Sequence, residues 1–315
     1  MSGVSVLVVS WNSCAVTLAC LRSLSACRAS CDMQVILSDN GSHDDTVAQV
    51  RAQCADVLVV ENGRNLGFAA AINRAAQKAT QPLLLLLNND AQVEPQALRD
   101  MLDIMAADQG IGVLGPQLVH SDGRLQNSAA AVPSLATETL NKSLLKMLFP
   151  ALFPGKFTAA EQLVTVPGVV GACLLTRTDS FRRLGGLSEE YFFYLEETDY
   201  CLRVQKAGLR VAVAPQIRVA HLLGHSANRV RLRARIEYHR SLFIFFRRQH
   251  GTGPLACLRI ILFLQHAGKC LGTALALTLT LFLHARLRGK LLLYARLLQW
   301  QILGCPVAMG LRRDG

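Results

Sequence analysis

The feature that most constrains the fold is an unbroken apolar run, Pro82 to Leu87, which ends at the polar triplet Asn88-Asn89-Asp90. Five consecutive leucines leave no polar side to face water, whereas a half-exposed strand alternates apolar and polar residues. Strands that are apolar on both sides belong to parallel sheets covered by helices on both faces. The run therefore predicts an α/β protein with a buried central sheet and with the polar triplet at a strand end.

The segments around this run alternate between strand and helix patterns. Short β-branched runs predict strands, and longer runs with helical periodicity predict helices. The predicted strands are Val4–Ser10, Met33–Ser38, Val57–Val60, Pro82–Leu87, Gly168–Leu175 and Val211–Ala214, and the predicted helices are Val16–Ala26, Phe68–Lys78, Glu94–Ala107, Ser180–Leu184 and Glu197–Ala207. Right-handed β-α-β connections of this kind give a mostly parallel sheet flanked by helices.

Residues 120 to 165 lose this alternation. Gly, Pro, Ser and Thr interrupt the segment, and an apolar patch lies at Leu144–Phe153. Such composition indicates loops. We interpret the segment as irregular structure that forms a lid.

Charge divides the chain into two regions. The first 217 residues contain 17 basic and 20 acidic residues, whereas the sequence from Arg218 onward contains 16 basic and 2 acidic ones. This asymmetry predicts two parts with different partners. We expect one domain over residues 1–228, with halves at about 1–118 and 119–228, and a basic, apolar helical region over residues 229–315.

The C-terminal region is rich in Leu, Arg and aromatic residues. Its longest uncharged run, Cys270–Leu283, is shorter than the roughly 20 residues that cross a bilayer, and Arg259, His266 and Lys269 interrupt its extension. We therefore predict a helical pair that lies in the membrane interface, with basic side chains on anionic lipid. The alternative is an apolar hairpin packed on the core or on a second subunit. The apolar residues after the arginine-rich run Arg229–Arg240 favour lipid over nucleic acid as the partner.

The cysteines and the amino terminus indicate the compartment. Ten cysteines are scattered without a CxxC pair, which favours reduced thiols and a protein that faces the cytosol. The first residues lack the basic opening and cleavage site of a signal peptide and are expected to begin a buried strand. Together with the basic C-terminal region, this predicts a peripheral protein on the cytoplasmic face of a membrane.

Four clusters of polar residues come directly after predicted strands in the sequence. In an open parallel sheet, ligands bind beyond the carboxyl ends of the strands. Turn-forming residues explain any one cluster by itself, but four on one edge predict a ligand site. Neither GxGxxG after the first strand nor a P-loop is present, which disfavours NAD and P-loop ATP chemistry. A divalent cation completed by phosphate oxygens is the natural occupant beside Asp90. The clusters are Ser10-Trp11-Asn12, Asp39–Ser42, Asn62–Phe68 and Asn88–Asp90.

Seven motifs resemble, in order, those of glycosyltransferase family 2. They are VSWN, DNGSHDDT, NLGFAAAINR, LLLLNNDA, GACLLTR, YFFYLEETDYCLR and HxxGxS, and the resemblance covers about residues 3 to 250. Within the family, the chain is most similar to bacterial rhamnosyltransferases of surface-polysaccharide assembly. The resemblance implies a GT-A fold and an inverting enzyme that uses a nucleotide-sugar donor.

The resemblance also implies the donor-side residues. Asp39 would contact the nucleobase, and Gly67 would allow close approach of the nucleotide or sugar, because glycine has no Cβ. Asn88-Asn89-Asp90 stands where the family has its DxD motif, with Asn in place of the first acid. Asp90 would hold Mg²⁺ or Mn²⁺ on the diphosphate, with His221 of the HxxGxS motif as a second ligand. The other implied donor-side residues are Ser10, Asn12, Ser42, Asn65, Asn88 and Asn89.

On the acceptor side, the resemblance implies a wall at Gly171 and Ala172 and a general base in LEETDYCLR. Glu197 occupies the position where the family usually has Asp, so Glu196 and Asp199 remain competitors. Asp199 and Arg203 are spaced i and i+4 on the predicted helix. They therefore form an ion pair, or Arg203 contacts substrate.

The interpretation that unites these features is a metal-assisted single displacement. It would move a sugar, L-rhamnose from dTDP-rhamnose, to a hydroxyl of a lipid-linked or lipopolysaccharide saccharide. A sugar nucleotidyltransferase is one alternative, but it would carry a Gly-rich basic loop after the first strand, where this chain has SWNSCAV. A non-catalytic sugar-nucleotide or membrane-binding module is the other, favoured if Asn88 and Glu197 mark a site that has lost activity.

Overall fold

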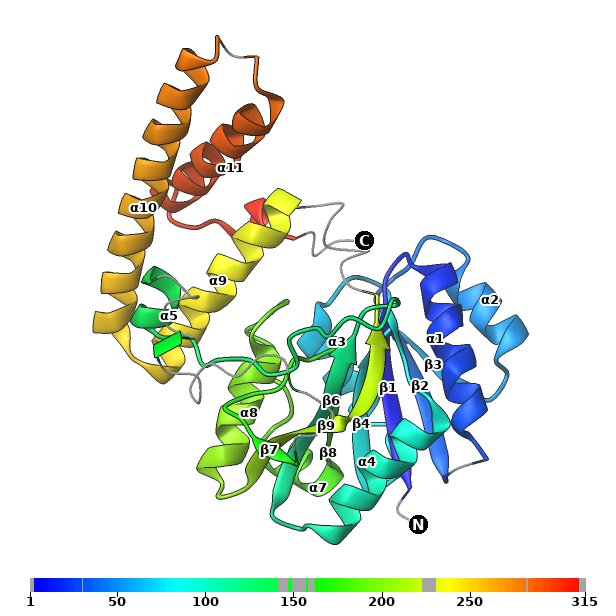
Figure 1. The fold of residues 1–315 in the computed structure, drawn as a ribbon. Helices are drawn as coiled ribbons and strands as arrows, with labels where there is room; N and C mark the ends of the chain where they lie inside the picture. Colours follow the sequence, from blue (N-terminus) through cyan, green and yellow to red (C-terminus); the bar gives the residue numbers. More distant parts are fainter. Residues whose placement is uncertain are drawn as a thin grey trace. The chain divides into compact units, whose positions relative to one another are not determined.

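The computed structural model describes residues 3–29, 31–140, 147–148, 157, 162–222, 231–281 and 283–311. The chain divides into two compact units. Unit 1 comprises residues 1–132, 143–226 and 313–315, and unit 2 comprises residues 133–142 and 227–312. Unit 1 contains the β-sheet, and unit 2 contains the C-terminal helices (Figure 1).

Unit 1 is built on a mixed sheet. In its described part, the strand order is β3-β2-β1-β4-β8-β6-β9-β5, with β7 beside β9. Neighbours from β3 to β4 run parallel, and β8 is antiparallel to both β4 and β6. The strands are β1 (Val4–Ser10), β2 (Met33–Asp39), β3 (Val57–Glu61), β4 (Leu83–Asn88), β5 (Ala91–Gln92), β6 (Ile111–Val119), β7 (Val164–Thr165), β8 (Cys173–Arg177) and β9 (Arg210–His221).

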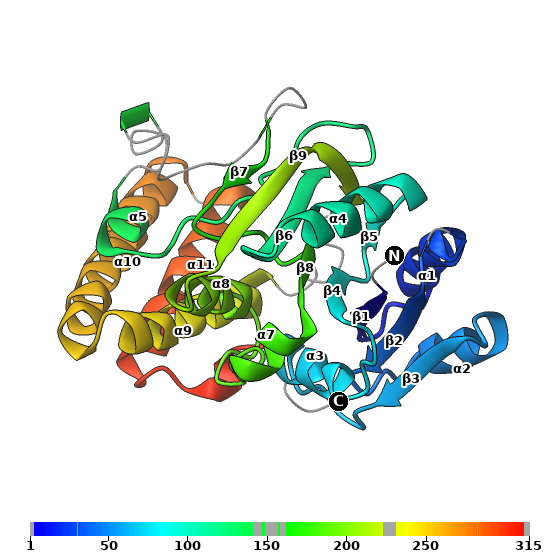
Figure 2. The ribbon, with the colours of Figure 1, turned by 90° about the horizontal axis from the view of Figure 1, so that it is seen from below.

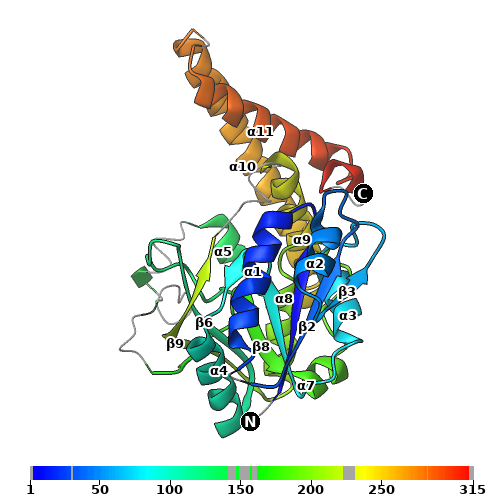
Figure 3. The same ribbon diagram turned by 90° about the vertical axis from the view of Figure 1, so that its right-hand side faces the viewer.

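Helices cover both faces of this sheet, as the leucine run predicts. Figure 2 shows α1 (Cys14–Cys27) and α4 (Pro95–Ala107) on one face, which Figure 3 views from the front. The opposite face carries α3 (Phe68–Ala76), α7 (Thr178–Arg183) and α8 (Glu196–Lys206). The leucines of β4 alternate between two cores, Leu83, Leu85 and Leu87 in one and Leu84 and Leu86 in the other. Each buried leucine contributes about 1.5–3 kcal/mol. The predicted α/β architecture is confirmed.

Two of the longer elements of unit 1, α2 (Thr46–Gln53) and β6, were not identified from the sequence patterns. Helix α2 buries only Thr46 and Val50, so its apolar periodicity is weak. Strand β6 contains two glycines and a proline that resemble loop signals, yet the whole strand is buried. A Cβ on Gly112 would lie 2.5 Å from a methyl carbon of Val204 on α8. The glycine there permits close packing of the helix and does not mark a loop.

Strand β9 is longer than the predicted strand Val211–Ala214 and runs through Pro215. The strand continues to His221, and its register with β6 jumps between the pairs Pro116–Ala214 and Gln117–Arg218. Residues 215–217 therefore lie in a bulge. Proline is tolerated there because a bulged residue does not need to donate a backbone hydrogen bond to the neighbouring strand. The extension carries His221 to the strand end, where it pairs with Ala91 of β5.

Parts of the segment predicted to be irregular are ordered. Helix α5 (Leu135–Thr139) begins at a capping box between Ser134 and Thr137, and β7 pairs with β9. Of the predicted apolar patch Leu144–Phe153, only residues 147 and 148 lie within the described part.

Unit 2 consists of α5 and three longer helices, α9 (Arg231–Gln249), α10 (Thr252–Leu279) and α11 (Ala285–Ile302), with a short 3-10 helix at Val307–Met309. Ile236, Leu297 and Trp300 form its buried centre. Within the described residues, α10 is the one helix whose length and composition would suffice to cross a membrane. The predicted helical pair corresponds to α10 and α11, which pack on each other.

Candidate active site

The four polar clusters predicted from the sequence lie along one edge of the sheet. Ser10 pairs in register with Asp39, and Val9 pairs with Asn88. The fourth cluster follows β3, and the Asn62 backbone N–H donates to the Asp39 carbonyl at 2.8 Å. Parallel strands place their carboxyl ends on the same side, so the clusters of β1 to β4 become neighbours.

A hydrogen-bonded loop holds the Asp39 carboxyl group in place. Asp39 is only 2% exposed, and its carboxylate accepts from the Ser42 backbone N–H at 2.8 Å and the Ser42 hydroxyl at 2.6 Å. The Ser42 Oγ in turn accepts from the backbone N–H of Asn12 at 2.9 Å, and the Asn12 Oδ1 accepts from His43. Ser10 is buried with its Oγ 2.8 Å from that of Thr17. Asn12 and Ser42 thus shape the loop around Asp39, while Ser10 anchors the start of α1.

Gly67 lies very close to Phe192, which belongs to the segment just before α8. Its φ is +85°, and a Cβ there would lie 2.4 Å from the Phe192 carbonyl oxygen. The backbone N–H of Phe68 donates to that same oxygen at 2.8 Å. Asn65 accepts from Gly67 N–H at 3.0 Å, and Asn40 donates to the Gly67 carbonyl at 3.1 Å. This loop therefore docks the Phe192 segment onto the donor-side edge.

The three residues of the Asn88–Asp90 triplet have different environments. The Asn88 backbone N–H donates to the Ala172 carbonyl at 2.9 Å, which joins β4 to the start of β8. The Asn89 amide donates to Ser13 and Thr17 at 2.7 and 3.0 Å, so it braces α1. Asp90 contacts His221, and its carboxylate Oδ1 lies 3.2 Å from the histidine Nε2.

The Asp90–His221 pair fits a divalent cation. Adjacent ligand atoms on an octahedral Mg²⁺ at 2.0–2.1 Å are about 3 Å apart, close to the observed separation. A carboxylate and a neutral imidazole suit Mn²⁺ as well. No group of three or more His, Cys, Asp or Glu side chains suited to a metal occurs among the described residues. Phosphate oxygens and water would therefore complete the coordination.

Glu197 lies in the first turn of α8, beside the Gly171-Ala172 segment. A Cβ on Gly171 would lie 3.2 Å from the Glu197 Cγ, so glycine leaves room for this longer acid. Tyr194 and Leu195, just before it, have φ values of +75° and +68°. Left-handed backbone at non-glycine residues costs about 1–3 kcal/mol each and persists only where the surroundings impose it. The strained pair turns the chain so that α8 begins at the edge of the site.

Burial raises the pKa of the Glu197 carboxyl above its ordinary value. Hydrogen bonds from the backbone N–H groups of Glu197, Thr198 and Leu195 oppose the rise. A carboxylate with a raised pKa is a stronger base than a solvated one, which suits a proton acceptor.

Asp199 and Arg203 are occupied by a structural contact. Asp199 is fully buried, and its Oδ2 accepts from the Arg203 Nε at 2.9 Å. The same guanidinium donates to the carbonyl oxygens of Leu184 and Gly186 at 2.6 and 2.8 Å. Glu196 is buried in the first turn of α8. The Asp199–Arg203 ion pair accounts for the i, i+4 spacing, and through Arg203 it also fixes the turn after α7.

Two residues at the site were not identified from the sequence. Gln126 contacts His221, and Phe192 contacts Gly67 and Phe68. Gln126 belongs to a segment without the apolar periodicity of a helix or strand, and the sequence pattern around Phe192 indicates only a buried aromatic residue. Gly224 and Ser226, the other two fixed positions of the HxxGxS motif, lie outside the described residues.

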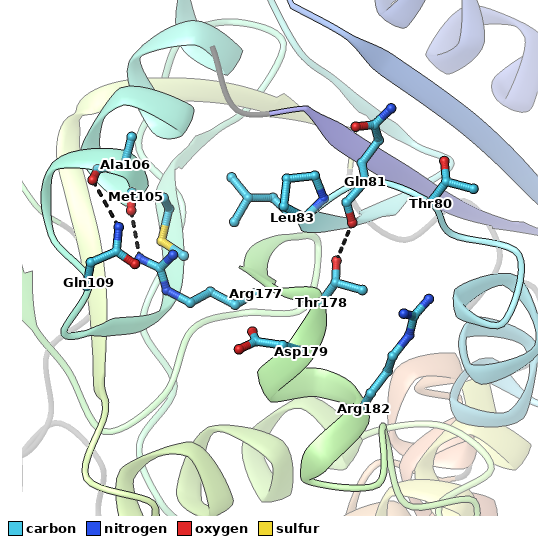
Figure 4. Close-up of a pocket in the computed structure, with 11 residues that line it drawn as sticks. Thr80, Gln81, Leu83, Met105, Ala106, Gln109, Arg177, Thr178, Asp179 and Arg182 are labelled. Carbon is cyan, nitrogen blue, oxygen red and sulfur yellow. Dashed lines mark hydrogen bonds between the residues drawn. The ribbon is translucent and has the colours of Figure 1, made fainter.

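A separate pocket of about 530 Å³ lies at the opposite edge of the sheet, beside the start of β4 (Figure 4). Its arginines hold backbone carbonyls. Arg177 donates to Met105 at 2.7 Å, and Arg182 donates to Ala79 at 2.8 Å. These contacts complete the ends of neighbouring segments, so we do not include the pocket in the candidate site.

Comparison with known proteins places this edge in context. Residues 5–185, more than half of the chain, match the family described as Glycosyl transferase family 2. The N-acetylglucosaminyl-diphospho-decaprenol L-rhamnosyltransferase of Mycobacterium tuberculosis is 31% identical over 245 residues, which cover 72% of this chain and 78% of that protein. A low-salt glycan biosynthesis hexosyltransferase of Haloferax volcanii is 22% identical over 60% of this chain and 58% of its own length.

Solved structures show the same fold. A mannosyltransferase from Pyrobaculum calidifontis, solved with GDP-Man and Mn²⁺, has a TM-score of 0.54 at 16% identity, covering 95% of this chain and 86% of that one. A likeness at this identity concerns the fold alone. Together with the family match and the mycobacterial relative, it shows that the chain is a glycosyltransferase and belongs to glycosyltransferase family 2.

Proposed function

We propose that the chain transfers L-rhamnose from dTDP-rhamnose to a hydroxyl of a lipid-linked saccharide, with inversion and with the aid of a divalent cation. The observation that carries the proposal is that an aspartate–histidine pair and a second carboxylate lie at one sheet edge. Asp90 contacts His221 there, and Asn88 binds Ala172, whose neighbour Gly171 packs on Glu197.

The donor would lie along the carboxyl ends of β1, β2 and β4. Asp39 would accept from the base, in the loop that Asn12 and Ser42 brace. Asp90 and His221 would hold Mg²⁺ or Mn²⁺ against the diphosphate. When bound, the cation neutralises the charge that develops on the leaving nucleoside diphosphate.

Glu197 would act as the general base. The bond from the acceptor oxygen to the anomeric carbon forms as the bond from that carbon to the diphosphate oxygen breaks, and the hydroxyl proton passes to the Glu197 carboxylate. Such proton transfer typically contributes about 10²- to 10⁴-fold to the rate. Asp199 is excluded from this role in the proposal because Arg203 binds it in the interior.

The choice of donor and acceptor follows the mycobacterial relative. Its name specifies L-rhamnose transfer and an N-acetylglucosaminyl-diphospho-decaprenol acceptor, and it shares 31% identity with most of this chain. A lipid-linked acceptor also agrees with the basic, apolar unit 2. We assign residues 1–228 to catalysis and residues 229–315 to the membrane surface.

Unit 2 carries a surface suited to the cytoplasmic face of an inner membrane. Ile260, Leu264, Leu271, Leu275 and Leu279 are 61–78% exposed and recur at spacings of four or seven residues. At 1.5 Å per residue they form a stripe about 30 Å long on one side of α10. The opposite side of the helix buries Leu258, Leu262 and Leu277.

This stripe favours a helix that lies flat in the membrane interface. Arg259 and Lys269 are exposed on the same helix, as are Arg286, Arg288 and Lys290 on α11. Leucine side chains would enter the acyl boundary while basic groups meet anionic headgroups.

Vesicle flotation tests this surface. The double variant Leu271→Glu/Leu275→Glu should lose binding to phosphatidylglycerol vesicles. Leu58→Glu, which changes a 44% exposed leucine on β3, should bind like the wild type. Unchanged flotation of the double variant would show that the stripe does not bind lipid.

Product analysis tests the transfer itself. The full-length chain, Mn²⁺, dTDP-rhamnose and a GlcNAc-diphospho-lipid should yield dTDP and a rhamnosylated lipid. UDP-glucose and GDP-mannose serve as competing donors. Release of pyrophosphate would indicate a nucleotidyltransferase, and preference for another donor would remove rhamnose from the proposal. Absence of transfer from every donor by folded protein would contradict a catalytic role.

A further inference from the structure

Gln126 makes two hydrogen bonds to one histidine, and together they orient its amide. Gln126 is 4% exposed, and its Nε2 donates to the His221 carbonyl oxygen at 2.6 Å. Its Oε1 lies 3.1 Å from the His221 Nδ1. A flipped amide would set its oxygen against a carbonyl oxygen, so the contacts permit one orientation. An amide oxygen only accepts, and therefore the hydrogen bond requires a proton on Nδ1.

We infer that Gln126 is a positioning residue that holds His221 as its Nδ1–H tautomer and so keeps Nε2 available to a cation. The inference rests on the proposed function, in which Asp90 and His221 hold that cation. A histidine ligand binds metal through an unprotonated nitrogen, and the partner of its other nitrogen selects which one that is.

Asp90 makes this selection necessary. Its Oδ1 lies 3.2 Å from the His221 Nε2, so without an opposing contact the carboxylate would favour a proton on Nε2. That tautomer would donate to Asp90, and both groups would then be engaged with each other. The Gln126 oxygen on the far side of the ring favours the other tautomer.

The backbone around Gln126 keeps the amide where it is. The Gln126 N–H donates to the Leu118 carbonyl at 2.8 Å, and the Gln126 carbonyl accepts from the Gln117 Nε2 at 2.7 Å. Both contacts belong to β6, whose register with β9 also places His221. One strand therefore supports both the histidine and the residue that orients it.

Gln126→Met tests the inference, because methionine is similar in size and lacks both hydrogen bonds. Gln126→Glu keeps an acceptor opposite Nδ1 but loses the donor to the His221 carbonyl oxygen. Gln34→Met is the matched control, since the Gln34 amide makes its hydrogen bonds with Ser5, Lys78 and Thr80. Binding of Mn²⁺ in the presence of dTDP is followed by the loss of the free-ion signal in electron paramagnetic resonance.

We expect Mn²⁺ affinity to fall by about 10- to 100-fold in Gln126→Met, the range typical for loss of an outer-shell partner. Gln126→Glu should recover at least part of the affinity, and Gln34→Met should match the wild type. Nitrogen NMR of ¹⁵N-histidine protein with Mg²⁺ and dTDP, at about two pH units above the ordinary imidazole pKa of about 6.5, should show Nδ1–H for His221. The signal is assigned with His221→Asn.

Two results would overturn the inference: a proton on Nε2 in the wild-type complex, or Gln126→Met with wild-type Mn²⁺ affinity. The NMR measurement on the wild type does not depend on whether Gln126→Met folds. Failure of the metal site itself is distinguishable, because Asp90→Asn would then leave Mn²⁺ affinity unchanged as well.

Discussion

Replacing Gly67 with alanine would test whether the loop around Gly67 positions the segment that carries Glu197, the proposed general base. Gly67 has a φ of +85° and a ψ of 175°, and its missing side chain leaves room for the Phe192 carbonyl oxygen. Phe192 precedes the strained residues Tyr194 and Leu195, which lead into α8 and Glu197. We expect Gly67→Ala to move this segment and to slow the transfer.

The magnitude follows from the contact. A Cβ at 2.4 Å from the Phe192 oxygen must retreat by about 1 Å to reach an ordinary van der Waals distance. A misplacement of about 1 Å at a catalytic site costs about 10²-fold in rate. The backbone conformation would cost an alanine about 1–3 kcal/mol. Weakening the hydrogen bond from Phe68 to Phe192 adds about 1 kcal/mol.

Gly63→Ala is the matched control in the same loop. Gly63 also has a positive φ, +72°, but no atom lies within 4 Å of a Cβ placed there. It should lose about 1–2 kcal/mol of unfolding free energy and keep its kcat. Urea unfolding and steady-state transfer from dTDP-rhamnose measure the two effects separately. A kcat for Gly67→Ala within about threefold of Gly63→Ala would refute the argument that Phe192 positions Glu197.

Three further outcomes are expected. Glu197→Gln should lower kcat by about 10²- to 10⁴-fold. Because burial raises the Glu197 pKa, the variant should also unfold at a higher temperature than the wild type near pH 7.5. This gain in thermal stability should disappear below the ordinary glutamate pKa of 4.5. Asp199→Asn should lower the urea-unfolding free energy by about 3–5 kcal/mol, since the neutral amide leaves the Arg203 guanidinium without its buried counter-charge, while the folded protein keeps most of its kcat. Burial lowers the pKa of His239 to about 4, so stability should decline as pH falls from 6.5 toward 4, and thermal unfolding of His239→Phe should show a flatter pH dependence.

Much of the candidate site could be located from strand ends. Asp39 and Asn88 follow apolar runs, and the shared direction of parallel strands places such residues on one edge. The i, i+4 spacing of Asp199 and Arg203 left two interpretations open. The structure distinguishes them, because Arg203 also binds the carbonyls of Leu184 and Gly186.

Other parts of the site left no local signal. Gln126 and His221 are 95 residues apart, and neither belongs to a periodic segment that would predict their contact. Phe192 lies within an aromatic run. This run predicts that Phe192 is buried, but it does not predict the contact with Gly67 and Phe68. Gly171 was expected to form part of an acceptor-side wall, and the structure shows that its missing side chain makes room for Glu197.

The amino-acid sequence alone determined the buried sheet, its β-α-β order and the sheet edge at which the polar clusters of the candidate site lie. These features depend on the periodicity of apolar residues and on chain direction, both of which are local. Only the tertiary structure decided that β9 continues past Pro215 and carries His221 onto Asp90. The position of a bulge and the register of strands about 100 residues apart depend on packing both faces of the sheet at once, and no short window of sequence contains that information.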